Sequence, residues 1–446
     1  MAMDLEANRR DRDRELAALT AERFDLVIVG GGVSGAALAC LATCGPRPLR
    51  VALIEARELA SGTSSRSSKL LHGGLRYLAH GRLGLVRRLL AGRAELAAFA
   101  PALVSPAPFL LPLGPRTPHA AWLLRAALGL YGALERSGPR APGLAAARHL
   151  EPDDAAFAEP LAAGLMTEGA LAYGELAVDD AGLVCALAER ARAAGARVVT
   201  GVAGNQLVRA FGRVVGVRAR DTVTGARFIV GGRAVVDATG PWSGAIGQRR
   251  RGDAAAPLRL SRGTHVVVPL ARLPLSRTLV FFGPRDGRAL FASPRGAQVL
   301  IGTTEVEHRG APEDVLPTRE EVSYLLRALA AAVPGARLGL EDVVTAFAGV
   351  RPLATGGGDA GALDRGYVVA SDEPGCLAMR GGKLTLALDG ARRALRALRA
   401  EARALCLPEI TIPAFGALCA PVALPAPRRA VRGPVAVREP ATWRAA

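Results

Sequence analysis

A glycine-rich turn between a buried strand and a helix constrains this fold more than any other feature of the sequence. The apolar run 24–29 ends in Gly30-x-Gly32-x-x-Gly35, and apolar residues at helical spacing follow it. Glycines at these places allow a tight turn, a close approach of the backbone to a pyrophosphate, and packing of the helix on the strand. Glu55 ends the next strand twenty residues after Gly35, where it can accept hydrogen bonds from ribose hydroxyls. The pattern predicts a βαβ unit that binds a dinucleotide.

A second turn favours FAD over NAD as that dinucleotide. Ala238-Thr-Gly240-Pro-Trp242 closes a later apolar strand, as in flavoproteins whose nucleotide domain is split along the chain. Taken alone, the same residues would be an ordinary Gly-Pro turn. The two turns together predict a flavin cofactor.

The length of 446 residues predicts two domains, because single cores stop growing at about 250 to 300 residues. The pattern indicates an α/β fold: a split, Rossmann-like FAD-binding domain of the GxGxxG type with an interleaved antiparallel-sheet substrate domain. Residues 1–23 are expected to form an exposed helix, and 101–118 a Pro-rich connector. The predicted ranges are an N-terminal extension at 1–23, the FAD-binding domain at 24–100, 170–245 and 340–400, the substrate or cap domain at 101–169 and 246–339, and a short Pro/Arg-rich, loosely ordered tail at 401–446.

The charge balance restricts the partners. Lys+Arg 57 against Asp+Glu 40 gives a net charge of +17, which attracts anionic small molecules, anionic lipid or nucleic acid and is equally compatible with a solvated arginine-rich surface. The sequence has no helix-turn-helix, zinc finger or interleaved basic-aromatic stripe, so we predict no nucleic-acid partner. Six scattered cysteines without a CxxC pair predict a reducing cytosol and no metal site.

An apolar helix expected at 120–134 bears on membrane contact. It is apolar around most of its circumference, with Arg125 and Arg136 as basic anchors, and it suits either a bilayer interface or a buried position. The first 23 residues lack the apolar stretch of a signal peptide, and no run reaches the roughly 18 apolar residues of a membrane span. We therefore expect a cytoplasmic protein that makes peripheral contact with the inner face of an anionic membrane.

The segment 61–77 is the most informative part of the chain. It reads Ser-Gly-Thr-Ser-Ser-Arg-Ser-Ser-Lys-Leu-Leu-His-Gly-Gly-Leu-Arg-Tyr and brings hydroxyls, cations and glycine amides together. A plain linker of this composition would be polar and flexible. The mixture suits a cradle for a pyrophosphate and an isoalloxazine ring better than it suits a linker.

The same segment closely resembles the signature of FAD-dependent glycerol-3-phosphate dehydrogenases, and the resemblance extends from about residue 24 to 386. Four further blocks keep the order of that family. They are Arg-Gly-Thr-His-Val-Val-Val-Pro at 262–269, Ile-Gly-Thr-Thr-Glu at 301–305, Ala-Gly-Val-Arg-Pro-Leu at 348–353 and Arg-Gly-Gly-Lys-Leu-Thr at 380–385.

The resemblance implies FAD-dependent oxidation of sn-glycerol 3-phosphate to dihydroxyacetone phosphate, with hydride transfer to flavin N5 and electrons passed to a quinone-type acceptor. His265 and Arg351 would be catalytic, with His265 the first candidate for the base and His72 the second, because imidazole titrates near working pH. Several cations suit a phosphate dianion, since guanidinium groups bind it in a bidentate way and ammonium groups act as point charges. The implied substrate-binding residues are Arg76, Tyr77, Thr304, Arg351, Arg365 and Lys383.

The resemblance also implies a set of residues around FAD. They are Gly30, Gly32, Gly35, Glu55, Thr63, Ser64, Ser65, Ser68, Lys69, His72, Gly73, Gly74, Val202, Ala238, Gly240, Trp242, Gly381, Gly382 and Leu384.

The sequence departs from the family at two places. Leu-Ala-Leu-Asp follows Thr385 where relatives have Thr-Tyr-Arg, and the fifty or so residues after Arg396 are too few for the helical C-terminal domain of the family. Two alternatives therefore stay open: a flavin oxidase of the same fold acting on an amino acid or amine, and an FAD-binding module of low activity. Oxygen is a second possible electron acceptor, and a homodimer is compatible with the resemblance.

Overall fold

The computed structural model describes residues 2–244, 246, 258–284, 286–353, 366–414 and 416–419. These residues form two compact units. Unit 1 contains the chain up to Ser65, Asp180–Arg259 and the described residues from Pro352 onward. Unit 2 contains Arg66–Asp179 and Leu260–Arg351.

Unit 1 is built on a twisted sheet that has eight strands among the described residues. The strands are β1 (Arg23–Val29), β2 (Val51–Glu55), β7 (Arg197–Thr200), β8 (Val202–Ala210), β9 (Arg213–Asp221), β10 (Arg227–Asp237), β17 (Tyr367–Glu373) and β18 (Cys376–Gly381). The main path runs β17-β18-β10-β1-β2-β7, and β8 and β9 extend from β10 as an antiparallel meander. All neighbours from β18 to β7 along this path are parallel, so their carboxyl ends meet at one edge of the sheet.

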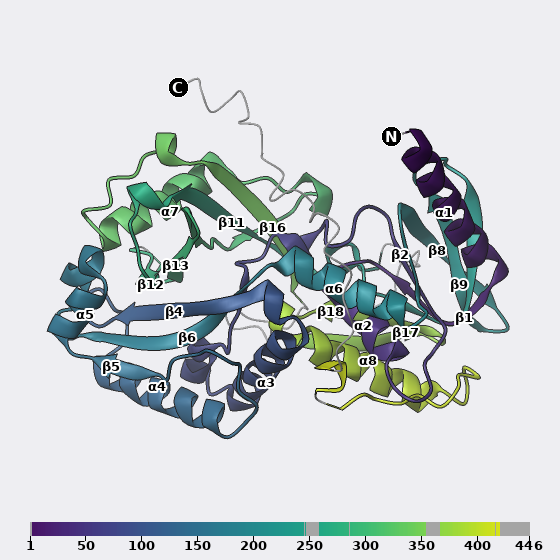
Figure 1. The fold of residues 1–446 in the computed structure, drawn as a ribbon, viewed down its shortest axis with the longest axis horizontal. Helices are drawn as coiled ribbons and strands as arrows, with labels where there is room; N and C mark the ends of the chain where they lie inside the picture. The colour runs from purple at the N-terminus through teal and green to yellow at the C-terminus, as the bar shows by residue number, and fades with distance from the viewer. Residues whose placement is uncertain are drawn as a thin grey trace. The chain divides into compact units, whose positions relative to one another are not determined.

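The helices of unit 1 are α1 (Ala2–Ala21), α2 (Val33–Thr43), α6 (Asp180–Ala193) and α8 (Ala387–Glu401). Helix α2 follows the glycine turn and is buried from Gly35 to Thr43. It packs against both α6 and α8, and Figure 1 shows it between them. Burial on all sides explains why α2 is a run of small and apolar residues without a polar face.

Helix α1 corrects one expectation from the sequence, because it is not a fully exposed extension. It packs on β7 and β10. Leu19 is fully buried, and Leu16 packs against the same apolar cluster, which includes Phe24. The charged residues of the segment obscured this narrow apolar stripe.

An ion pair fixes α1 to the meander. The Arg12 guanidinium binds Asp221 and donates to the carbonyl oxygens of Thr200 and Gly201. Burial acts to raise the pKa of Asp221, but hydrogen bonds from Thr224 and Val223 and the Arg12 charge outweigh it and lower that pKa from 3.8 to about 2.

We expect Asp221→Asn to destabilise the protein at pH 7 and to have a shrinking effect below pH 4. A carboxyl group whose pKa is lower in the folded state stabilises that state above its unfolded pKa, and the contribution is lost as the pH falls through the folded pKa. Urea unfolding of both proteins at pH 7 and pH 3 measures the difference. An equal difference in stability at the two pH values would contradict the role of the ionised carboxylate.

Unit 2 contains a sheet with ten strands among the described residues. They are β3 (Leu70–Leu71), β4 (Val104–Pro112), β5 (Arg148–Leu150), β6 (Ala170–Val178), β11 (Arg259–Pro269), β12 (Thr278–Phe282), β13 (Ala289–Arg295), β14 (Gln298–Gly302), β15 (Val306–Glu307) and β16 (Thr345–Leu353). The order is β15-β11-β14-β13-β12-β4-β6-β3, with β16 on β11 and β5 on β6. The antiparallel substrate-domain sheet predicted from the sequence is present, and β4 joins β12 in parallel.

The helices of unit 2 are α3 (Leu83–Phe99), α4 (Ala121–Arg136), α5 (Pro152–Ala158) and α7 (Arg319–Ala332). Helix α7 begins with a capping box between Thr318 and Glu321 and covers the sheet near β12 and β13, as Figure 1 shows. Helices α3 and α4 pack together. None of the helices in the described part of the chain is long and apolar enough to cross a bilayer.

The structure differs from the predicted organisation in two respects. Residues 66–100, 170–179 and 340–351 belong to unit 2 rather than to the FAD-binding domain, because β3 and β4 pair with β6, α3 packs on α4, and β16 pairs with β11. The expected Pro-rich connector contains β4, which pairs with β6 along its whole length and buries Phe109 to Leu111. The described part of the expected loosely ordered tail buries Leu405, Ile410 and Leu418. Beyond residue 419 the tail lies outside the described residues.

Candidate functional site

In unit 1, the predicted cofactor residues follow the carboxyl ends of parallel strands. Gly30 follows β1, Glu55 ends β2, Val202 comes two residues after β7, Ala238 follows β10 and Gly381 ends β18. Ligands of open α/β sheets bind outside these strand ends. Because the strands from β18 to β7 are parallel neighbours, segments far apart in sequence reach the same edge.

Two of the three motif glycines are required by backbone packing. Gly30 has φ +114, and a Cβ there would lie 2.6 Å from the carbonyl oxygen of Ala238. A Cβ on Gly35 would lie 2.0 Å from the carbonyl oxygen of Gly30. Gly32 is less confined, because a Cβ there would lie 3.2 Å from Ser64 Oγ. The absence of a side chain at Gly32 therefore leaves space for a ligand and is not required by backbone packing.

The start of α2 suits a pyrophosphate. Gly32 is the N-cap and offers no side-chain cap, and the first turn contains no acidic residue, which leaves the positive end of the helix dipole available to an anion. Ser64 Oγ accepts a hydrogen bond from Val33 N at 2.9 Å. Glu55 Oε2 accepts from Gly31 N at 2.6 Å, which fixes the carboxylate beside the glycine turn.

Two further turns of unit 1 contain residues that were predicted to bind the cofactor. Trp242 lies against Gly62, and the Arg57 guanidinium stacks over its ring at 5.0 Å. Gly382 has φ +88, and a Cβ there would lie 2.3 Å from the ring of Tyr367, whose hydroxyl contacts Ser34 Oγ at 3.0 Å.

Tyr367 therefore ties the turn at 381–382 to the first turn of α2. Lys383 and Leu384 come directly after that turn, and Lys383 is half-buried at the start of a short 3-10 helix. The residues of unit 1 thus fit FAD: backbone amides and a helix N-terminus for the pyrophosphate, and Glu55 for the ribose.

The segment 61–77 passes from unit 1 into unit 2 after Ser65. Lys69 takes φ 52, a left-handed conformation that is uncommon for a non-glycine residue. Ser67 Oγ accepts from Lys69 N at 3.0 Å, and the Lys69 carbonyl oxygen accepts from Val178 N and from the Arg295 side chain, both at 3.1 Å. Burial lowers the pKa of Arg295 to about 10. These contacts hold the middle of the segment in one conformation.

A buried ionic cluster holds the next turn of the segment. Both carboxylate oxygens of Glu175 accept from Gly73 N, at 3.1 and 3.0 Å. The Tyr131 hydroxyl donates to Glu175 at 2.8 Å, and Arg93 forms ion pairs with Glu175 and Glu135. Arg93 and Glu175 are 1% and 2% exposed.

The cluster keeps its charges paired. Burial raises the pKa of Glu175, and the Arg93 charge and the hydrogen bonds from Tyr131 and Gly73 oppose this rise. Burial acts to lower the pKa of Arg93, but the neighbouring carboxylates raise it overall. A Cβ on Gly73 would lie 2.1 Å from the Tyr131 hydroxyl, so only glycine fits between this cluster and Leu90.

His265, the first candidate for the base, lies on β11 and is 1% exposed. Its ring stacks on Phe347 with centroids 5.0 Å apart, and its Nε2 contacts Ser68 Oγ at 3.0 Å. Burial lowers the pKa of His265 to about 3, and the charges of Arg351 and Lys69 act in the same direction. The imidazole is therefore neutral near pH 7 and keeps one lone pair for a proton.

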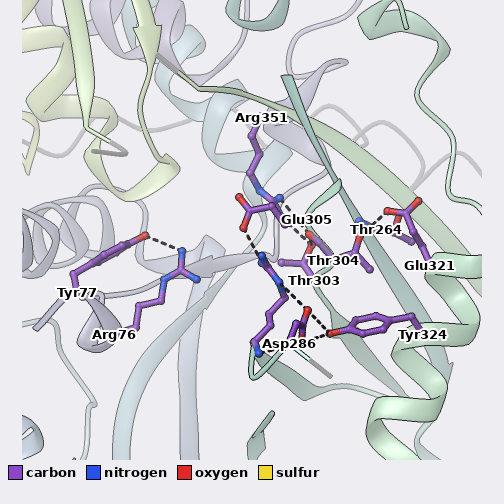
Figure 2. A network of polar contacts seen from close by, with 11 residues as sticks. Arg76, Tyr77, Thr264, Asp286, Thr303, Thr304, Glu305, Glu321, Tyr324 and Arg351 are labelled. Atoms are coloured by element: carbon purple, nitrogen blue, oxygen red, sulfur yellow. Dashed lines mark hydrogen bonds and ion pairs between the residues drawn. The ribbon is translucent and has the colours of Figure 1, made fainter. Parts of the chain in front are cut away.

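Arg351 lies beside this histidine at the end of β16. Its guanidinium donates to Thr303 Oγ1 at 2.9 Å and to the carbonyl oxygen of Thr304 at 3.3 Å. The absence of a side chain at Gly263 leaves space for this guanidinium, since a Cβ there would lie 2.1 Å from Arg351 Nη2. Figure 2 shows Arg351 reaching the Thr303-Thr304 turn.

Thr304 connects Arg351 to α7. Its hydroxyl donates to Glu321 at 2.7 Å and accepts from Thr264 N at 2.8 Å. Glu321 also pairs with Arg262. In Figure 2, Arg76 and Tyr77 form a separate group, in which the guanidinium donates to the Tyr77 hydroxyl at 3.1 Å.

The structure thus brings His265, Arg351, Thr304, Ser68 and Lys69 together within unit 2, and places Arg76 with Tyr77. His72, the second candidate for the base, is partly buried just before Gly73. Gly74, at φ +77, lies close to Tyr77, with a Cβ position 2.6 Å from the ring. Thr63 and Ser65 lie with Ser64 in a short 3-10 helix of unit 1, Gly240 begins another that ends at Trp242, and Arg365 lies outside the described residues.

Sequence reasoning missed the residues that position these groups. Glu175, Arg93 and Glu321 are charged residues on a strand and two helices, and the local pattern around Arg93 and Glu321 does not mark them as buried. A weak signal exists for Glu175 alone, since it interrupts an otherwise apolar strand. Their partners are far away in sequence, for example 102 residues from Gly73 to Glu175.

The chain is similar in sequence to a known protein family and to several named proteins. The profile of the family described as FAD dependent oxidoreductase matches residues 25–405. The glycerol-3-phosphate dehydrogenase of Mycobacterium leprae is 36% identical over 392 residues, which are 87% of this chain and 65% of that protein. The aerobic glycerol-3-phosphate dehydrogenase of Staphylococcus saprophyticus is 32% identical over 371 residues, 82% of this chain and 65% of that protein.

A solved structure is also similar. The glycerol-3-phosphate dehydrogenase of Bacillus halodurans complexed with FAD has a TM-score of 0.72 and 29% identity, and the match covers 91% of this chain and 69% of that one. The chain spans less than two thirds of the length of the curated relatives named above. The predicted fold class and the prediction of FAD as cofactor are confirmed. The chain belongs to the family of FAD-dependent oxidoreductases.

Proposed function

We propose that this chain oxidises sn-glycerol 3-phosphate to dihydroxyacetone phosphate. The observation that carries the proposal is the group formed by Arg351, Lys69 and the neutral, buried His265: cations for an anionic substrate beside a base for its hydroxyl proton. The names of relatives that are 32% and 36% identical support the same substrate.

FAD, when bound, supplies the acceptor for the hydride of the carbinol carbon. The protein supplies binding and proton transfer. Arg351 stays in a fixed orientation because Thr303 and Thr304 accept its hydrogen bonds, and we assign to it, with Arg76, Arg365 and Lys383, the binding of the phosphorylated substrate. His265 takes up the hydroxyl proton. Fixed cations and a desolvated base lower the barrier without covalent chemistry.

Turnover of a substrate panel tests the proposal. The holoenzyme is assayed with sn-glycerol 3-phosphate, glycerol, glycine and proline, each with dichlorophenolindophenol, menadione or oxygen as acceptor. We expect turnover with sn-glycerol 3-phosphate alone, and faster turnover with the dye and the quinone than with oxygen. Turnover with glycine or proline instead would support the oxidase alternative, and no turnover with any substrate would support the FAD-binding module.

Gly263→Ala tests the role of Arg351 without removing it. The new methyl group displaces the end of the flexible Arg351 side chain and leaves the backbone in place. We expect KM for sn-glycerol 3-phosphate to rise about 10- to 100-fold, as for loss of a charge-assisted hydrogen bond worth about 1.5–3 kcal/mol, with flavin content unchanged. Gly231→Ala is the control, because a Cβ there meets open space. Equal KM values in both variants would remove Arg351 from the substrate site.

A quinone acceptor and peripheral membrane contact extend the proposal. Helix α4 buries Leu128, Tyr131 and Leu134 on one side. On the other side, Trp122 is 71% exposed and Leu130 is 42% exposed. Arg125 and Arg136 flank that face. An apolar face with basic flanks suits an anionic bilayer interface.

We expect Trp122→Ser with Leu130→Ser to reduce co-sedimentation with phosphatidylglycerol vesicles by at least half. The apolar side chains supply burial at the interface, and the basic flanks supply attraction that salt weakens. Phe211→Ser is the matched control, since Phe211 is 97% exposed in unit 1. If the control loses as much binding as the α4 variant, α4 is not the contact. Sedimentation velocity of the same samples measures the proposed homodimer.

A further inference from the structure

His265 is enclosed so completely that a substrate cannot reach its nitrogens directly. The residue is 1% exposed, Phe347 stacks on one face of the ring, and Gly302 lies so close to its edge that a Cβ there would be 2.3 Å from Cδ2. Among the described residues, Nδ1 is buried without a hydrogen-bond partner. The other nitrogen, Nε2, contacts Ser68 Oγ at 3.0 Å.

Ser68 differs from His265 in its exposure. It is half-buried and lies on the segment 61–77, so its hydroxyl has one side toward the imidazole and can present another to a ligand. The next residue, Lys69, is held at φ 52 by Ser67, Val178 and Arg295. The direction of the Ser68 side chain is therefore fixed by the turn that follows it.

We propose that Ser68 relays the substrate proton to His265, so that Ser68 is a catalytic residue and His265 acts through it. The inference rests on the proposed function. The substrate O–H proton moves to Ser68 Oγ while the Ser68 O–H proton moves to His265 Nε2. FAD, when bound, would accept the hydride of the carbinol carbon and with it two electrons, so that the carbinol would become a carbonyl. In hydrolase triads a histidine likewise takes the proton of a serine hydroxyl, although there the serine oxygen attacks the substrate.

The relay requires one tautomer of the neutral ring. Nε2 must carry the lone pair and Nδ1 the proton, since Ser68 donates to Nε2. The positive charges of Arg351 and Lys69 face the ring and oppose its protonation. A phosphorylated substrate brings two negative charges and offsets them, which favours uptake of the proton only when substrate is bound.

The first test compares Ser68→Ala with Ser68→Thr in the holoenzyme. We expect Ser68→Ala to slow anaerobic flavin bleaching by sn-glycerol 3-phosphate about 100- to 1000-fold, within the range of general acid–base catalysis, with the substrate Kd changed less than about threefold. Ser68→Thr keeps the hydroxyl and should recover the rate to within about tenfold of the wild type. Ser293→Ala removes another buried hydroxyl of the same unit, which contacts Thr278, and should bleach at the wild-type rate.

The second test is a nitrogen-15 NMR spectrum of the histidine side chains at pH 7, with the His265 signals assigned by their loss in His265→Gln. We expect His265 protonated at Nδ1. Protonation at Nε2, or bleaching of Ser68→Ala within twofold of the wild type, would overturn the relay. Loss of flavin from both Ser68 variants would assign the hydroxyl to the cofactor and also overturn it. If sn-glycerol 3-phosphate fails to bleach the wild type, the proposed function falls, and the tautomer alone decides the Ser68 assignment.

Discussion

Arg93→Met is expected to lower the free energy of unfolding by about 3–5 kcal/mol, because it leaves the carboxylates of Glu175 and Glu135 without their buried cation. Removal of one partner of a buried pair costs more than removal of both. The double variant Arg93→Met with Glu175→Gln should therefore recover at least half of the loss, since the amide can still accept from Gly73. Chemical denaturation of the three proteins measures these values.

The control for this prediction is an arginine paired at the surface. Arg14 pairs with Asp11, and their side chains are 80% and 73% exposed. Exposed pairs of this kind contribute about 0–1 kcal/mol, so Arg14→Met should stay close to the wild type. If Arg93→Met is no more destabilised than Arg14→Met, the cluster does not stabilise the fold. Because Glu175 holds Gly73 in the segment 61–77, we also expect Arg93→Met to lose activity before it unfolds.

Gly35→Ala is expected to weaken the affinity for FAD at least about a hundredfold. The new Cβ would lie 2.0 Å from the carbonyl oxygen of Gly30, so either the glycine turn or α2 must move. Overpacking of this kind costs about 1–3 kcal/mol of stability, and the pyrophosphate loses the aligned amides that hold it. The absorbance ratio of flavin to protein after purification, and fluorescence titration of the apoprotein, measure the effect.

Gly84→Ala is the matched control for this helical position. It lies in the first turn of α3, and a Cβ there meets open space. Alanine also favours a helix over glycine by about 0.5–1 kcal/mol, so this variant should bind FAD normally and be no less stable. Normal flavin content in Gly35→Ala would show that FAD binding does not depend on the close approach of residue 35 to the Gly30 carbonyl oxygen.

The sequence was sufficient for features that depend on neighbouring residues. The strand at 24–29, the glycine turn and the helix after it were predicted from the sequence and correspond to β1 and α2, because burial, turn chemistry and helical spacing all act locally there. The antiparallel sheet of unit 2 was likewise indicated by apolar runs such as 265–268 and 299–301, which form parts of β11 and β14. The grouping of His265 with Arg351 followed only from the resemblance, and the structure places both in unit 2.

Features that depend on distant partners were not predictable in this way. Tyr367 bonds Ser34 across 333 residues, and neither residue carries a local sign of the other. Helix α1 looked exposed because its charges outnumber the few leucines that it buries. Strand β4 looked like a connector because of its prolines, yet its ladder with β6 fixes it in the sheet. In each case a tertiary contact outweighed local propensity.

Anaerobic titration of the purified holoenzyme with sn-glycerol 3-phosphate tests whether this chain oxidises that substrate through its flavin. We expect the absorbance of the oxidised flavin to be lost on mixing, and to be lost more slowly in Gly263→Ala. An unchanged spectrum with sn-glycerol 3-phosphate, in a sample that dithionite reduces fully, would contradict it.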